Sequence, residues 1–179
     1  MWGIYMEKLK KKLSNKLDRP VFEIDVQGDR QRIPCLFDTG ADIPVFTYGQ
    51  EMLLLYYPNA ILQENFYAEI GGFGKIAEPA FIYNIPNFTI RSDDDQDYIQ
   101  YYNLFIACID KESIKYPFIL SATMFKHMNY YVDNLKQDNR ELTIYHNRMI
   151  YGTGINTIYT HEKRKFIKYN SYIIDTMIQ

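Results

Sequence analysis

The chain has 179 residues, of which 47% are hydrophobic and 16% are aromatic, so it can build one packed domain with modest extensions. Its formal net charge is only -2, which gives no reason to expect nucleic acid or an anionic membrane as the main partner. The longest apolar run covers Met52–Tyr57, far short of the ~20 residues that a transmembrane helix needs. We therefore expect a protein that acts on proteins or small ligands, with no membrane partner.

The first segment, residues 1–18, has the spacing of an amphipathic helix. Apolar side chains at Met6, Leu9, Leu13 and Leu17 are separated by three or four residues, with lysines between them, which predicts a helical N-terminal arm over 6–17. A basic helix on a membrane surface is the alternative, but bulky apolar anchors are few. The segment lacks the continuous apolar stretch and small-residue cleavage site of a secretory signal, so we expect a cytoplasmic protein.

From Arg19 onward the pattern changes to that of strands. Apolar and acidic residues alternate over 22–26, a turn-forming cluster follows at 27–29, and an apolar run over 33–37 completes a hairpin that leads into Asp38. Further strands are predicted at 45–46, 66–70, 76–83, 88–90, 98–108, 118–120, 130–132 and 142–145.

Two short helices are expected among these strands. The Leu-rich stretch 49–57 is long enough for one helix, which Pro58 would end, and 121–128 is predicted to form the other. The fold class is therefore mainly β with one or two short helices. We expect one domain over 19–149, followed by a C-terminal extension over 150–179 to which no role is assigned.

Several other kinds of site are disfavoured by their spacing. Cys35 and Cys108 lie in apolar runs, which favours buried thiols over a disulfide. The glycines before Lys75 lack the first glycine and the final Ser or Thr of a phosphate loop. The acidic run 93–97 has Tyr98 where a calcium loop needs glycine, and the three histidines lack paired zinc spacing. No metal and no cofactor is predicted.

The segment that points to chemistry is Asp38-Thr39-Gly40. A carboxylate acts as a general base at an apolar site when the backbone holds it near a water molecule. The apolar strand before Asp38 would place it at the bottom of a cleft, the Thr39 hydroxyl could brace the turn, and Gly40 allows a tight backbone approach. Ala41 and a second acid, Asp42, follow directly.

The string from Cys35 to Asp42 resembles the active-site loop of the retropepsins, the small aspartic peptidases of retroviruses, retroelements and related cellular and bacterial proteins. Three features within 21–145 follow in the family's order. Ile70-Gly71-Gly72-Phe73-Gly74-Lys75 resembles the flap tip, 118–120 the strand that enters a late helix, and 142–145 a strand close to the dimer-forming sheet. Ser121-Ala122-Thr123 departs from the glycine that is usual there, and about ten extra residues precede the flap, which fits a cellular or bacterial branch better than a viral one.

The resemblance implies a closed β-barrel of the acid protease fold with a glycine-rich flap hairpin. Aspartic peptidases use two carboxylates on one water, and Asp38 is the only aspartate here that is followed by Thr-Gly or Ser-Gly. An active enzyme would therefore be a homodimer in which two Asp38 side chains hydrolyse a peptide bond of a protein substrate. By the same resemblance, Thr39 and Gly40 support the catalytic loop, and the substrate-binding residues are Ala41, Asp42, Gly71, Gly72, Phe73 and Gly74. The alternative is a catalytically silent module of the same fold that dimerises or binds peptides.

Overall fold

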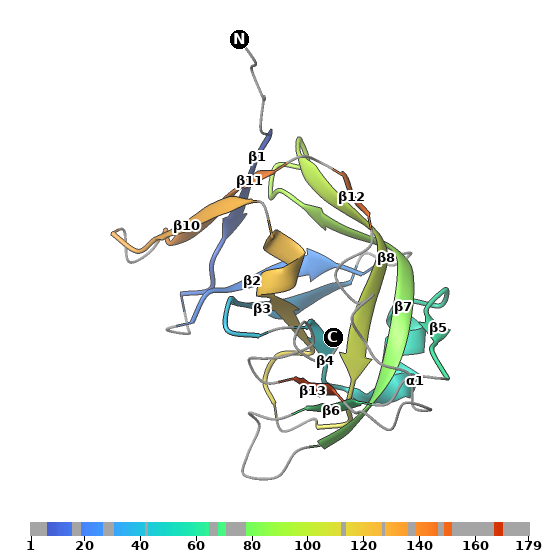
Figure 1. The fold of residues 1–179 in the computed structure, drawn as a ribbon. Helices are drawn as coiled ribbons and strands as arrows, with labels where there is room; N and C mark the ends of the chain where they lie inside the picture. Colours follow the sequence, from blue (N-terminus) through green and yellow to red (C-terminus); the bar gives the residue numbers. More distant parts are fainter. Residues whose placement is uncertain are drawn as a thin grey trace.

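The computed structural model describes residues 7–15, 19–26, 31–41, 43–64, 68–70, 78–111, 114–126, 128–135, 139–146, 149–151 and 167–169. The chain is mainly β, as its alternating apolar pattern predicts: the described residues form strands, one α-helix and one short 3-10 helix (Figure 1). None of the described helices is long and apolar enough to cross a membrane.

A large sheet contains most of the predicted strands. Its main path has the order β13-β6-β7-β8-β4-β9-β3-β2. Outside this path, β12 pairs with β8 and β5 pairs with β7. The strands of this sheet are β2 (Val21–Asp25), β3 (Arg32–Asp38), β4 (Val45–Phe46), β5 (Ile61–Leu62), β6 (Ala68–Ile70), β7 (Glu78–Arg91), β8 (Tyr98–Cys108), β9 (Phe118–Ser121), β12 (Met149–Tyr151) and β13 (Ile167–Tyr169). The predicted hairpin before Asp38 is confirmed, because β2 and β3 pair antiparallel from Val21 opposite Leu36 to Asp25 opposite Arg32.

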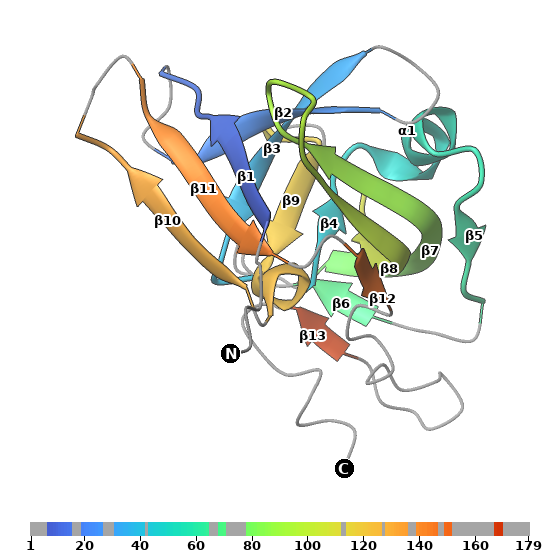
Figure 2. The ribbon, with the colours of Figure 1, turned by 90° about the horizontal axis from the view of Figure 1, so that it is seen from above.

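The closed barrel that we expected is not found among the described strands. The sheet path is open, with β2 at one end and β13 at the other. It is nevertheless strongly curved, and the long β7–β8 hairpin bends around one side of the molecule (Figure 2). The β7–β8 ladder is interrupted at Pro86, which has no N–H to donate, opposite Asn103 at φ 58°.

The predicted helix over 6–17 is wrong for the residues that the structure describes there. Instead, β1 (Glu7–Lys12) pairs antiparallel with β11 (Glu141–His146), and β10 (Asn129–Asp133) completes a three-stranded sheet of order β1-β11-β10. Every second residue over 9–13 is buried: Leu9, Lys11 and Leu13 are buried, whereas the residues between them are exposed or half-buried. Lys11 therefore occupies an inward position of a strand, which an apolar-only count does not register.

The described residues of the two terminal segments pair with strands of the predicted domain. β1 shares a sheet with strands from the predicted domain, so the expected boundary between 18 and 19 does not separate an arm from a domain. In the predicted extension 150–179, residues 150–151 belong to β12, which pairs parallel with β8, and β13 pairs parallel with β6.

The inner strands β3, β4 and β9 of the large sheet are covered on both faces, because they are apolar at consecutive positions. Along β3, Cys35 and Phe37 belong to one apolar cluster and Leu36 to the other; along β9, Phe118 and Leu120 face the first cluster and Ile119 the second. Continuous apolar runs are typical of strands that are covered on both sides. The small sheet adds Leu9, Leu142 and Ile144 to the first cluster.

The helix prediction for 49–57 is confirmed by α1 (Gly49–Tyr56), which is followed by Tyr57 and Pro58. Its first residue, Gly49, has φ +87°, a conformation that side chains rarely adopt. The second predicted helix is reduced to a 3-10 turn over Ala122–Phe125, directly after β9.

Candidate active site

Asp38 is the last residue of β3, an inner strand of the large sheet that lies next to the terminal strand β2. β3 pairs antiparallel with β2 on one side and parallel with β9 on the other, where Asp38 lies opposite Ser121. The buried residues before it, Cys35, Leu36 and Phe37, fix the strand in the two apolar clusters. Asp38 itself is half-buried, so the strand carries its carboxylate from the core to the surface.

A tight turn after β3 sets the position of this carboxylate. The Gly40 N–H donates to Asp38 Oδ1 at 2.9 Å, and the Ala41 N–H donates to the Asp38 carbonyl at 3.2 Å. A Cβ placed on Gly40 would lie only 3.2 Å from Asp38 Oδ1, so the turn leaves little room for a side chain there. Thr39 and Gly40 are exposed and Ala41 is half-buried.

The turn is also tied to the end of β9. The Ala122 N–H donates to the Ala41 carbonyl at 3.0 Å, and the hydroxyls of Ser121 and Thr123 share a hydrogen bond of 2.7 Å. The backbone of Ala122 therefore holds the loop after Asp38 against the end of β9. We expected the Thr39 hydroxyl to brace the turn with a hydrogen bond, but it makes none within the described part of the chain. The hydrogen bond that braces the turn there runs from the Gly40 N–H to Asp38 Oδ1.

An aromatic group lies directly behind the turn. The Phe37 ring is 4.7 Å from that of Phe125 and 4.9 Å from that of Tyr130, measured between ring centroids. Phe37 and Phe125 are buried, whereas Tyr130 on β10 is 39% exposed. These rings join β3, the 3-10 turn and the small sheet, so the turn at Asp38 has an apolar support on one side.

The remaining predicted site residues, Asp42 and the glycine-rich segment Gly71, Gly72, Phe73 and Gly74, lie outside the described residues. The strands on either side of the segment do pair: β6 and β7 are antiparallel, with Ile70 opposite Glu78. Residues 71–77 therefore connect two hydrogen-bonded strands, which is the topology that a flap hairpin requires. Within the described residues, no three His, Cys, Asp or Glu side chains are grouped so that they could hold a metal ion.

The two cysteines are buried and unbonded, as the sequence predicted. Burial raises the pKa of both thiols, that of Cys108 to about 12, because a thiolate would lose its hydration. Protonated, buried thiols are poor nucleophiles, so these residues have a packing role and do not compete with Asp38 as a reactive group.

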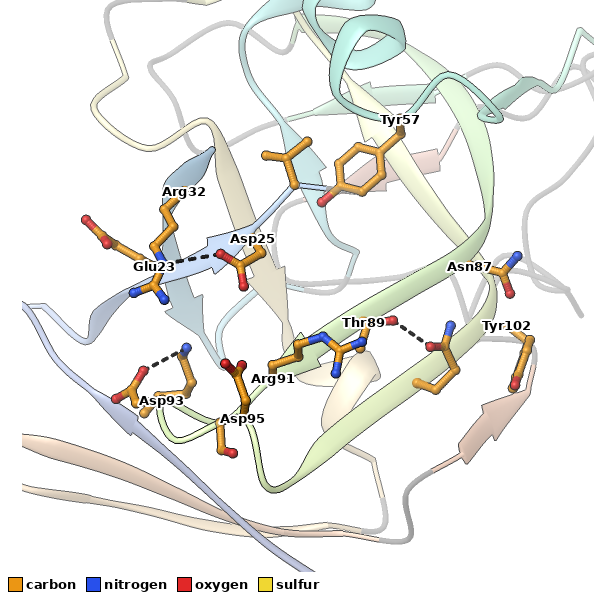
Figure 3. Close-up of a pocket in the computed structure, with 14 residues that line it drawn as sticks. Glu23, Asp25, Arg32, Tyr57, Asn87, Thr89, Arg91, Asp93, Asp95 and Tyr102 are labelled. Atoms are coloured by element: carbon orange, nitrogen blue, oxygen red, sulfur yellow. Dashed lines mark hydrogen bonds and ion pairs between the residues drawn. The ribbon is translucent and has the colours of Figure 1, made fainter. Parts of the chain in front are cut away.

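A polar cavity of about 410 Å³ lies at the other end of β3 and was missed by sequence reasoning. Arg32, the first residue of β3, lines the cavity (Figure 3). Asp38 is the last residue of the same strand. A strand rises about 3.3 Å per residue, so the two places are about 20 Å apart. Its lining comes from β1, β2, β3, β7, β8, the turn between β7 and β8, and the residues that follow β2 and α1. Residues that come together from so many separate elements leave no short motif in the sequence.

Two ion pairs lie on the wall of this cavity. Lys11 Nζ is 2.9 Å from Asp93 Oδ1, and Arg32 Nε is 3.2 Å from Asp25 Oδ1. Lys11 is almost fully buried, and its pairing with Asp93 connects β1 to the turn between β7 and β8. The sequence pattern gave no signal for this region, because it indicated a helix over 6–17 and the inward position of Lys11 is seen only in the structure. A lysine is rarely buried without a charged partner.

No protein-family model, no curated protein and no solved structure matches this chain.

Proposed function

We propose that the chain is one subunit of a homodimeric aspartic endopeptidase of the retropepsin type, with Asp38 as its catalytic residue. The observation that carries the proposal is the position of Asp38: at the end of a buried inner strand, partly open to solvent, with its Oδ1 held by the Gly40 N–H at 2.9 Å. A carboxylate held in this way can share a water molecule with a second carboxylate from a partner.

The second carboxylate must come from another copy because Asp38 is the only aspartate in an Asp-Thr-Gly or Asp-Ser-Gly triplet. Two adjacent carboxylates cannot both ionise easily, so the pair would hold one proton between them. The protonated Asp38 would orient the scissile carbonyl, and the ionised one would deprotonate the attacking water. The exposed corner Thr39-Gly40 leaves the turn accessible to a symmetric partner.

An extended peptide is the substrate class that this geometry favours. The segment 71–77 connects the antiparallel strands β6 and β7, and an extended peptide can bind beside such backbone groups like an added strand. Resemblance assigns Ala41, Asp42, Gly71, Gly72, Phe73 and Gly74 to substrate binding, and the half-buried Ala41, tied to Ala122, lies next to Asp38.

The test is cleavage of casein and of a peptide library between about pH 4 and pH 7, the range in which a shared-proton carboxylate pair works. We expect Asp38→Asn to lower kcat/KM by about 10²–10⁴-fold, the usual contribution of an acid–base group. Asp110→Asn is the matched control, because Asp110 is exposed and distant in sequence from the turn. Equal thermal unfolding of the three proteins would show that the fold is intact.

Two results would contradict the proposal in different ways. Cleavage by both the wild type and Asp38→Asn would remove Asp38 from the mechanism. No cleavage by the wild type, with an intact dimer in sedimentation, would favour the alternative of a silent module that dimerises or binds peptides.

A further inference from the structure

The cavity at the Arg32 end of β3 contains a buried polar group without a partner. The Tyr57 side chain is only 2% exposed, and its hydroxyl makes no hydrogen bond to any of the described residues. Figure 3 shows this hydroxyl pointing from the end of α1 into the cavity. A buried hydroxyl without a hydrogen bond is costly, so the site is suited to a molecule that offers an acceptor or donor there.

The cavity wall carries charged side chains besides the two ion pairs, and more of them are negative than positive. Lys11 neutralises the charge of Asp93, and Arg32 neutralises that of Asp25. Three charged side chains of the lining then have no ion pair or side-chain hydrogen bond within the described residues: Arg91 at the end of β7, Glu23 on β2 and Asp95 in the β7–β8 turn. Counted over the residues that the structure describes, the cavity thus offers one cation and two carboxylates without an ion pair.

The ligand that complements these charges has one carboxylate and two cationic groups. Arg91 can bind a carboxylate through two parallel N–H donors, and the two carboxylates can each accept from an ammonium or guanidinium. A volume of about 410 Å³ falls within the range of small-molecule sites, about 300–1,000 Å³. We propose that this cavity binds a free basic amino acid, of the lysine or arginine class, through Arg91, Asp95, Glu23 and the Tyr57 hydroxyl.

The site is separate from the catalytic corner and does not depend on it. Asp38 is not among the cavity residues, and β3 extends between the two places. Such a ligand would bind whether or not Asp38 is catalytic. Because Lys11 of β1, Glu23 of β2 and Asp95 of the β7–β8 turn all line the cavity, a bound ligand would also link the small sheet to the large one.

The experiment is a titration of the full chain with L-lysine and L-arginine, followed by amide chemical shifts and by calorimetry. We expect saturable binding, with the largest shifts at Tyr57, Arg91 and Asp95 and none at Asp38. L-Norleucine lacks the side-chain cation and cadaverine lacks the carboxylate, so each should bind at least about tenfold more weakly, which is the loss of about one charge-assisted contact.

Four variants assign the contacts. Arg91→Gln and Asp95→Asn should each weaken L-lysine binding about tenfold, and Tyr57→Phe, which removes only the hydroxyl, several-fold. Asn tolerates the positive φ of Asp95 (58°), so that variant keeps the turn. Asp110→Asn, outside the cavity, should bind as the wild type does. Equal affinity for norleucine, shifts centred on Asp38, or no saturation by about 10 mM would each overturn the proposal.

Discussion

The turn after Asp38 depends on the absence of a side chain at Gly40. A Cβ at this position would approach Asp38 Oδ1 to 3.2 Å, so the carboxylate would have to move by a few tenths of an ångström. Since no positive φ is required of Gly40, an alanine there should displace the acid while it costs the fold little.

We therefore expect Gly40→Ala to lower kcat/KM by about tenfold or more, because catalysis is sensitive to small displacements of a reacting group. The matched variant is Gly49→Ala. Gly49 has φ +87° and only ordinary contacts around its Cβ position, so this change should cost about 1–2 kcal/mol of stability through its backbone and leave the specific activity unchanged. Kinetics and urea unfolding of both proteins would check this pairing, and a destabilised Gly40→Ala with normal activity would contradict it.

The buried thiols predict a pH dependence of stability. Burial raises the folded-state pKa of Cys108 from its ordinary 9.0 to about 12, and it raises that of Cys35 as well. Their contribution to stability is therefore complete below about pH 9 and is lost as the pH rises toward 12, because the unfolded chain ionises first. Replacing both residues with alanine should flatten this alkaline decline in urea unfolding.

The same burial predicts the reactivity of the thiols. At pH 8 a thiol reagent should modify neither cysteine in the folded protein and both after denaturation, since Cys35 and Cys108 are no more than 1% exposed. Rapid labelling of the native protein would show that the strands β3 and β8 open on the time scale of the reaction.

At the scale of elements, the strand β1 is held by a lysine that points inward. Lys11 Nζ pairs with Asp93, and the Lys12 N–H donates to the same carboxylate at 2.5 Å. This carboxylate is 45% exposed, whereas the Lys11 side chain is 7% exposed. Removal of the carboxylate would leave a nearly buried ammonium without its counter-charge.

We expect Asp93→Asn to destabilise the protein by about 1–3 kcal/mol, less than for a fully buried pair because water reaches Asp93. In a Lys11→Met background the same change should cost much less, since the buried charge is already absent. Urea unfolding of the four proteins gives the coupling between the two residues. Independent effects of the two changes would show that β1 is not held by this pair.

This strand also shows how far the sequence determines the fold. The hairpin before Asp38, α1 and the long strand β8 were predictable from their local apolar patterns. β7 was expected as two strands, 76–83 and 88–90, because Asn84, Pro86 and Asn87 interrupt the apolar pattern of what is one strand. β1 was not, because Leu9 and Leu13 fit both a helix with period near four and a strand with period two; only the burial of Lys11 distinguishes them. Similarly, Asp38 was found from a local triplet, whereas the cavity residues come together only through sheet pairing.

At the scale of the whole molecule, the proposed function requires two chains. Sedimentation at micromolar concentration should show a dimer. Mixing wild type with Asp38→Asn gives a sharper measurement: if the subunits exchange and each active site needs both acids, activity should follow the square of the wild-type fraction, leaving about one quarter in an equal mixture. A linear decrease would mean that each chain works alone. Asp110→Asn in place of Asp38→Asn should leave the activity of the mixture unchanged.

The parallel pairing of β3 with β9 has a consequence for how the protein is made. Asp38 lies opposite Ser121, about 80 positions later in the chain, and the turn after Asp38 is tied to Ala122. Closing so long a loop is slow relative to local hairpins such as β2–β3. The ribosome must therefore release β9 before the turn at Asp38 can take its final shape. Until then, the unfinished polypeptide carries the Asp-Thr-Gly triplet without the strand that positions it.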